Sequence, residues 1–73
     1  MTMTLFTVRA DYMRMEYGSL FTVAATEASE AEDLVRAKIQ YYWDLEVTIK
    51  KCDPIGTADN RFDEPQIVEY FMA

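Results

Sequence analysis

The sequence predicts an α+β fold, a two-layer ββαββ arrangement in which one helix packs on a four-stranded antiparallel sheet. Apolar and polar residues alternate in four short segments, two early and two late in the chain, and this period of two is typical of strands with one buried face. A segment between the two pairs has helical spacing, and a helix with one apolar stripe needs one sheet face to cover it. The length of 73 residues is that of a single domain, so residues 1–73 are assigned to one domain.

The first two strands are predicted over residues 4–12 and 20–26, because apolar residues occupy every second position in both segments. Gly18 and Ser19 suit the turn between them, since glycine adopts positive φ without a steric cost. The two strands therefore form a β-hairpin. Its tip either presents adaptable side chains to a partner or folds them over the margin of the core. These side chains are Met13, Met15 and Tyr17.

The helix is predicted over residues 30–43. Ser29 and Glu32 match a capping box, in which the serine oxygen accepts a hydrogen bond from the third helical N–H and the glutamate reaches back to the cap. Apolar residues then recur at helical spacing on one face. They are Ala31, Leu34, Val35, Ile39, Tyr41 and Tyr42. Lys38 lies within this stripe, where its aliphatic stem is expected to cover apolar surface while its ammonium group reaches solvent.

The third and fourth strands are predicted over residues 45–51 and 66–72. Pro54 and Gly56 are expected to end the third strand, because proline cannot donate to a strand ladder and glycine bends it. Residues 53–65 then form a polar loop. In the fourth strand, one face is assigned Ile67 and Phe71 and the other Val68, Tyr70 and Met72. The predicted order across the sheet, in chain numbering, is 2-1-3-4, because a right-handed crossover from the second strand to the third leaves a gap for the first.

The balance of charged residues excludes several classes of function. The chain has 13 acidic and 7 basic side chains, no histidine and a formal net charge of −6. Phosphate groups repel such a chain, so direct binding of DNA or RNA is not expected. The lack of histidine removes the commonest proton shuttle and metal ligand and excludes Ser-His-Asp and Cys-His catalysis. We therefore predict a protein that is not an enzyme and that uses no cofactor and no metal.

Cys52 is the single cysteine of the chain, so an internal disulfide is excluded. One of its neighbours, Lys50 or Lys51, would lower the pKa of the thiol if it lay close to it. The alternative is an inert, half-buried cysteine at a strand end.

Two groups of acidic residues are candidates for binding a basic partner by charge complementarity. The helix group comprises Glu30, Glu32, Asp33 and Asp44, and the loop group comprises Asp59, Asp63 and Glu64. The structural alternative is a solvated helix whose first-turn acids complement the helix dipole. The loop acids do not have the spacing of a calcium-binding loop, so no metal site is predicted there.

Three consecutive aromatic residues end the predicted helix. Because they spread over about 200° around the helix axis, they cannot all face one core, and Trp43 above all is expected to be exposed. Tyr41 and Trp43 are therefore candidate anchors for a partner. The alternative is that the indole ring covers the edge of the sheet.

The N-terminus lacks the basic and apolar regions of a signal peptide, and no run approaches the roughly 18 apolar residues of a membrane span. We expect a cytoplasmic protein without membrane contact, with either Met1 or Met3 as the native start.

Taken whole, the chain resembles the small inhibitors encoded by phages and other mobile elements, the anti-CRISPR proteins in particular. The resemblance rests on small size, acidity, lack of histidine and ββαββ order, and it carries over no site residues. It implies a protein-binding inhibitor that acts in the host cytoplasm by occupying the basic surface of a nucleic-acid-binding complex, such as a CRISPR effector. One alternative is a structural or assembly subunit that forms a homodimer through an edge strand or the free sheet face. Another is an acidic accessory subunit of a larger enzyme.

Overall fold

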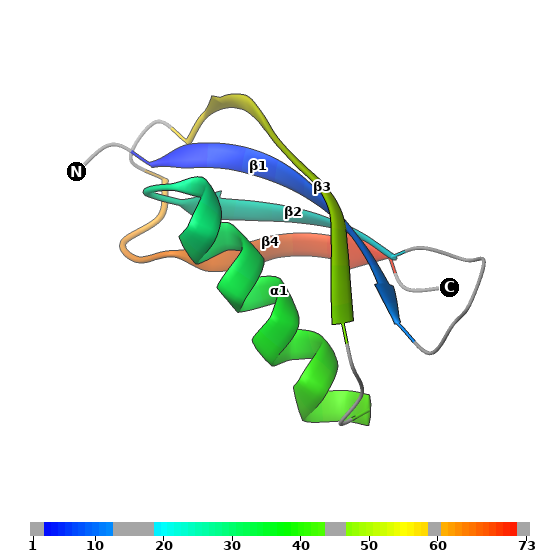
Figure 1. The fold of residues 1–73 in the computed structure, drawn as a ribbon. Coiled ribbons are helices and arrows are strands. Elements are labelled where there is room, and N and C mark those ends of the chain that lie inside the picture. The colour runs from blue at the N-terminus through cyan, green and yellow to red at the C-terminus, as the bar shows by residue number, and fades with distance from the viewer. Residues whose placement is uncertain (1–2, 13–18, 44–46, 59–60, 72–73) are drawn as a thin grey trace.

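The computed structural model describes residues 3–12, 19–43, 47–58 and 61–71. Its elements are β1 (Thr4–Tyr12), β2 (Ser19–Ala25), α1 (Ala28–Trp43), β3 (Val47–Thr57) and β4 (Gln66–Phe71). All strand pairs are antiparallel, and α1 lies across one face of the sheet (Figure 1). The predicted fold class, one helix on a four-stranded antiparallel sheet in the order ββαββ, is confirmed. Within these residues, no helix is long and apolar enough to cross a membrane.

The main core lies between α1 and the sheet. From the helix come Ala31, Val35 and Ile39, which are four residues apart and so share one face. From the sheet come alternating residues of β1 and β2, namely Phe6, Val8, Ala10, Phe21, Val23 and Ala25, which confirms the alternation predicted for the first two strands. Ser19 is buried beside them, and its hydroxyl donates a hydrogen bond of 2.9 Å to the carbonyl oxygen of Ala10.

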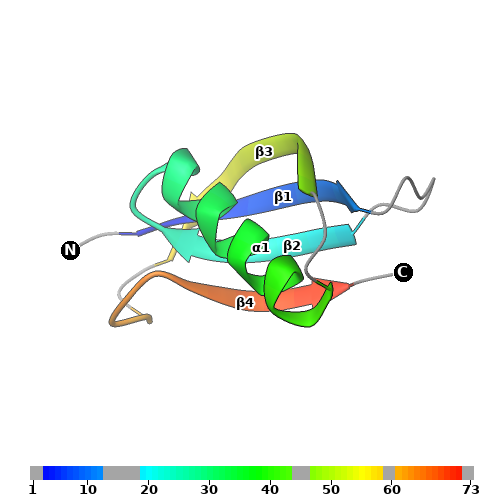
Figure 2. The same cartoon turned by 60° about the horizontal axis from the view of Figure 1, so that its bottom comes forward.

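The helix crosses the sheet diagonally, from β3 at its start to β4 at its end (Figure 2). Near the start, the Cys52 thiol of β3 lies 3.9 Å from the carbonyl oxygen of Ala28. Near the end, the ammonium group of Lys38 lies 5.1 Å from the centre of the Tyr70 ring of β4. Lys38 therefore places its charge over an aromatic face, which is a cation–π arrangement.

The order of strands across the sheet is β3-β1-β2-β4, so the predicted order 2-1-3-4 is wrong in the place of the fourth strand. β4 pairs with β2 and not with β3. The cause lies in the β3–β4 connection, where the Ala58 N–H donates a 2.9 Å hydrogen bond to the Met3 carbonyl oxygen. Ala58 is buried with Met3 and Ala24, and Leu5 and Phe62 pack against them. By crossing the ends of β1 and β2, the connection buries apolar side chains that a tight hairpin would leave in water.

β3 is longer than predicted, because it continues through Pro54 and Gly56 to Thr57. These residues are accommodated because β3 is an edge strand, and proline is tolerated on an edge where its missing N–H breaks no ladder. The pairing with β1 shifts register at two points and skips Lys50 and Ile55. The first five residues of the predicted loop over 53–65, residues 53–57, are therefore strand.

The helix begins at Ala28, two residues before the predicted start, and Ser29 is not its cap. The Glu27 carbonyl oxygen accepts the first helical hydrogen bond, from the Ala31 N–H at 3.2 Å, so Glu27 holds the cap position. Ser29 lies inside the first turn, where its hydroxyl donates to the Glu27 carboxylate at 2.9 Å. Glu30 bonds back to the chain before the helix, a role that the sequence pattern assigned to Glu32.

β4 contains a register shift opposite Thr22 and Val23, which skips Val68. Such a bulge exchanges the faces of the residues that follow it. Ile67 accordingly packs on the core, and Tyr70 joins it on the helix side by stacking on Phe21, with ring centres 5.7 Å apart. Phe71 lies on the opposite face, so its predicted grouping with Ile67 is wrong.

Candidate functional site

Among the described residues, the sheet face away from α1 is covered at one end and open over the rest. At the covered end, Ala58 and Phe62 of the β3–β4 connection pack on Met3, Leu5 and Ala24. The open part forms two rows of cross-strand neighbours. One row is Lys51, Arg9, Leu20 and Phe71, and the other is Asp53, Thr7, Thr22 and Glu69. This surface has a polar half on β3 and β1 and a half with exposed apolar residues on β2 and β4.

Leu20 and Phe71 are paired neighbours on β2 and β4, and they are 46% and 70% exposed. A hollow beside them is lined by Thr22, Glu69 and Tyr70 as well. Neighbouring strands lie about 4.8 Å apart, so the two side chains form one apolar patch rather than two isolated residues. The carboxylate of Glu69, two residues from Phe71 on the same strand, borders this patch. We refer to Leu20, Phe71 and Glu69 as the β4 patch.

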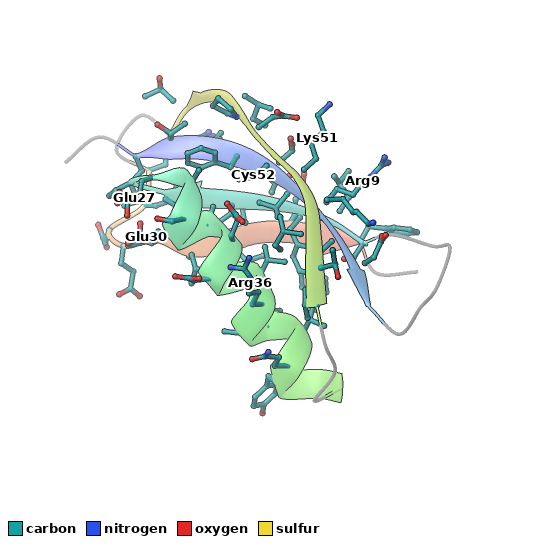
Figure 3. The ribbon with its side chains drawn as sticks, viewed as in Figure 1. Arg9, Glu27, Glu30, Arg36, Lys51 and Cys52 are labelled. Carbon is teal, nitrogen blue, oxygen red and sulfur yellow. The ribbon has the colours of Figure 1, made fainter. Side chains whose placement is uncertain are left out.

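The other half of the open face carries basic groups. Arg9 and Lys51 are paired neighbours on β1 and β3 and project from the sheet on the side away from α1 (Figure 3). The Lys51 ammonium lies 3.4 Å from the Asp53 carboxylate, and these side chains line a second hollow with Thr7 and Leu20. Leu20 therefore joins the basic half and the apolar half of the face.

The acids of the helix serve local structure. Glu32 and Asp33 both bind Arg36, at 3.4 and 3.2 Å. Glu30 accepts hydrogen bonds from the backbone N–H and hydroxyl of Thr26, at 2.8 and 2.9 Å. The predicted binding residues Glu30, Glu32 and Asp33 thus already have intramolecular partners, although Asp33 remains exposed.

Two acids of the loop, Asp63 and Glu64, lie at the same end of the sheet as the helix start (Figures 1 and 2). Asp63 and Glu64 are exposed and precede β4, whose first residue, Gln66, pairs with Ala24 at the end of β2. Both views place this loop and the β2–α1 turn at the same end of the sheet (Figures 1 and 2). Glu27 is exposed at that turn, so acids from two segments lie at the same end of the sheet.

The remaining predicted binding residues have mixed outcomes. Tyr41 is 82% exposed, because it lies two residues beyond the buried Ile39, about 200° around the helix. Its assignment to the apolar stripe is therefore wrong. Asp44 and Asp59, the side chain of Trp43 and the hairpin-tip residues Met13, Met15 and Tyr17 lie outside the described residues.

Cys52 is shielded rather than activated. Burial, followed by the charges of Glu32 and Asp53, raises the pKa of its thiol. Neither Lys50 nor Lys51 lowers that pKa, since each lysine forms an ion pair with an aspartate. Of the two alternatives, the structure therefore favours the half-buried cysteine. Lys51 also points to the opposite face of the sheet from the thiol. The thiol therefore stays protonated at neutral pH and has little nucleophilic character.

Among the described residues, no group of three or more histidine, cysteine or acidic side chains is arranged to hold a metal ion. Comparisons with protein-family models, with curated proteins and with solved structures gave no match. Sequence reasoning missed Leu20 and Phe71. The signal for Leu20 was present, because it is out of phase with Phe21, Val23 and Ala25, whereas the face of Phe71 depends on the bulge at Val68.

Proposed function

We propose that this chain is a non-enzymatic protein-binding module that inhibits a nucleic-acid-binding complex by occupying its basic surface. The observation that carries the proposal is the β4 patch, in which exposed Leu20 and Phe71 are neighbours and Glu69 borders them. Protein interfaces commonly combine a small apolar anchor, which supplies most of the affinity, with charges at the rim that guide encounter and select the partner.

The acidic balance of the chain supports a basic target. A chain with a net charge of −6 attracts lysine-rich and arginine-rich surfaces. The attraction acts within the Debye length, which is about 8–10 Å near physiological salt. Asp63, Glu64 and Glu27 add local negative charge at the end of the sheet where β4 begins. Surfaces of that kind bind nucleic acid, so an acidic protein seated there competes with DNA or RNA. The resemblance to anti-CRISPR proteins makes a CRISPR effector complex the first target to test.

The experiment measures binding of target DNA by purified CRISPR effector complexes of different types, with and without this protein. We expect one type to lose DNA binding in proportion to added protein. Phe71→Ala should raise the concentration needed by about tenfold or more, as expected for an interface anchor. Ile55→Ala is the matched control, since Ile55 is an exposed apolar residue of the other edge strand, at 56%, and it should inhibit like the wild type.

Two results would contradict the proposal. If no complex loses nucleic acid at any protein concentration, inhibition by occupation of a basic surface is wrong. If the protein is a dimer by light scattering at both low and high salt, and Phe71→Ala makes it a monomer, the β4 patch serves self-assembly, as in a structural subunit.

A further inference from the structure

We infer that the outer edge of β4 adds an extended strand of the partner, with basic side chains on the open side of the sheet and apolar or uncharged side chains on the helix side. The inference rests on the proposed function, because it specifies which part of the partner contacts β4 and in which conformation. Addition of a strand to a sheet edge is a common mode of peptide recognition, in which main-chain hydrogen bonds give affinity and alternate side chains give specificity.

The two edges of the sheet differ in their protection. β3 carries the features that natural proteins use to prevent edge pairing: it contains Pro54, its register shifts at Lys50 and Ile55, and Lys50 and Lys51 stand next to each other. An incoming strand would meet interrupted geometry and two cations there. β3 is therefore protected against pairing with an added strand.

β4 lacks most of these features. Its sequence from Gln66 to Phe71 has no proline, lysine or arginine, and it has one register shift, at Val68. In the described part of the chain β4 pairs with β2 alone, so the backbone groups on its other side face outward. Val68, Tyr70 and Phe71 are 42%, 48% and 70% exposed, and these apolar side chains lie along the open edge.

The charges around β4 specify what an added strand must carry. Glu69 lies on the open side of the sheet, and the exposed Asp63 and Glu64 precede β4 in the chain. On the helix side, the ammonium group of Lys38 lies over the Tyr70 ring. Lysine or arginine is therefore favoured toward Glu69 and disfavoured toward Tyr70, where apolar or uncharged side chains fit. Arg9 belongs to β1, two strands from β4 and about 10 Å across the sheet, so it opposes a basic strand only weakly.

A second copy of this chain fits the same edge less well. Antiparallel pairing of β4 with the β4 of a second copy would bring the two Glu69 carboxylates close together. It would also join two chains that each carry a net charge of −6. Like charges on neighbouring strands are destabilising. A basic extended segment meets no such repulsion.

The test uses synthetic peptides of about eight residues, long enough to cover one strand, in which lysine alternates with valine or threonine in every arrangement. A control set replaces lysine with glutamate, and a second control set carries N-methyl groups on alternate backbone nitrogens. Each peptide is titrated to millimolar concentration, and amide hydrogen exchange is followed by NMR. We expect lysine peptides to slow exchange in residues 66–71 and to leave residues 47–57 unchanged. Glutamate and N-methylated peptides should have no effect.

Two variants test the edge itself with the same change in net charge. Val68→Lys places an ammonium group on the bulge of β4, and Ile55→Lys places one on the exposed bulge of β3. We expect Val68→Lys to weaken binding of the lysine peptides by about tenfold, as a charged residue on an edge strand opposes pairing. Ile55→Lys should change it by less than about twofold, as expected for a rim charge far from the contact. Circular dichroism of both variants confirms that they are folded.

Several outcomes would overturn the inference. These are the absence of protection in residues 66–71 with every lysine peptide, equal protection by glutamate or N-methylated peptides, and protection of residues 47–57 instead. Protection of β4 without peptide in a protein that light scattering shows to be a dimer would identify a second copy as the occupant. If a complex is inhibited but the peptides leave β4 unprotected, only this inference fails. If peptides protect β4 but no complex is inhibited, the proposed function fails.

Discussion

Thr26 donates both its backbone N–H and its hydroxyl to one carboxylate oxygen of Glu30, at 2.8 and 2.9 Å. This pair fastens the end of β2 to the first turn of α1. The glutamate also lies where the helix dipole favours negative charge. The start of the helix thus depends on a bond that reaches back four residues rather than on the Ser29–Glu32 pair that the sequence pattern suggests.

The first prediction follows from this bond. Glu30→Ala and Thr26→Ala should each lower the free energy of unfolding by about 0.5–2 kcal/mol, the usual range for loss of a helix cap. Ser29→Ala is the control and should change stability by less than about 0.5 kcal/mol, because the Ser29 hydroxyl makes one bond, to Glu27, and does not join the helix to the end of β2. Urea unfolding followed by circular dichroism measures all three. A larger decrease in the free energy of unfolding for Ser29→Ala than for Glu30→Ala would show that Ser29 caps the helix, as the sequence pattern predicts.

The second prediction tests the order of strands. Thr22 and Glu69 are cross-strand neighbours on the open face, within the Cα separation that a disulfide needs, about 4.4–6.8 Å. Thr22→Cys with Glu69→Cys, in a protein that also carries Cys52→Ser, should therefore form an intramolecular disulfide under mild oxidation. Asp53→Cys with Glu69→Cys should not, because about 14 Å of sheet separates β3 from β4. Mass spectrometry of alkylated samples distinguishes the two.

The third prediction concerns Cys52. Because its pKa is raised in the folded protein, iodoacetamide should react with it more slowly in the folded protein than in urea at pH 8. The same shift makes a contribution to stability that is fully present below the pKa of the unfolded thiol, about 8.5. That contribution is lost as the pH rises through the higher folded pKa.

Cys52→Ser isolates the contribution of the thiol, because it leaves every other side chain unchanged. The variant should lose less stability than the wild type between pH 8 and pH 10, as measured by urea unfolding at each pH. A steeper decline in the variant, or equal alkylation rates with and without urea, would show that the thiol is not shielded.

The fourth prediction locates the charge that steers binding. Asp63→Asn with Glu64→Gln removes two charges next to β4 without disturbing the hydrogen bonds between Thr26 and Glu30. This double variant should associate with an inhibited complex about tenfold more slowly at low salt and dissociate at a similar rate, since exposed charges act mainly on encounter.

The matched control for that variant removes two charges from β1 and β3, the half of the sheet away from β4, through Asp11→Asn with Asp53→Asn. Both of these aspartates already form ion pairs with lysines, so their loss should slow association much less. Equal slowing by the two double variants would assign the effect to net charge alone. Association rates from biolayer interferometry at two salt concentrations provide the measurement.

The strands and the helix were predictable where local pattern decides them. Phe6, Val8 and Ala10 alternate with polar neighbours, and Ala31, Val35 and Ile39 are four residues apart, so their faces follow from the geometry of each element. The place of β4 was not predictable in this way. It depends on the burial of Ala58 and Phe62 under the ends of two distant strands, and both residues lie in a segment that is otherwise polar.

The candidate site was predictable only in part, for a related reason. The acidity of the surface follows from composition alone. Helical spacing also predicts that one of the three aromatic residues at the helix end is exposed. The sequence analysis expected Trp43 above all, whereas the exposed aromatic residue that the structure describes there is Tyr41. The β4 patch depends on a single skipped residue, Val68, which turns Phe71 away from the core and beside Leu20. A bulge of this kind arises from the fit between two strands, and the sequence of either strand alone does not contain it.

The position of β1 has a consequence for how the protein is made. Of the four strands, β1 is synthesised first, yet it lies inside the sheet, with Thr4 paired to both Ala25 and Thr57. The first pairing closes a short hairpin, whereas the second must wait for a segment 53 residues later (57 minus 4) and carries a larger loop-closure entropy. A nascent chain that ends before β3 therefore leaves one side of its inner strand without a partner. A chain that ends before β4 can already form three adjacent strands under the helix, so on the ribosome the β4 edge, from which we infer partner binding, is the last part of the sheet to appear.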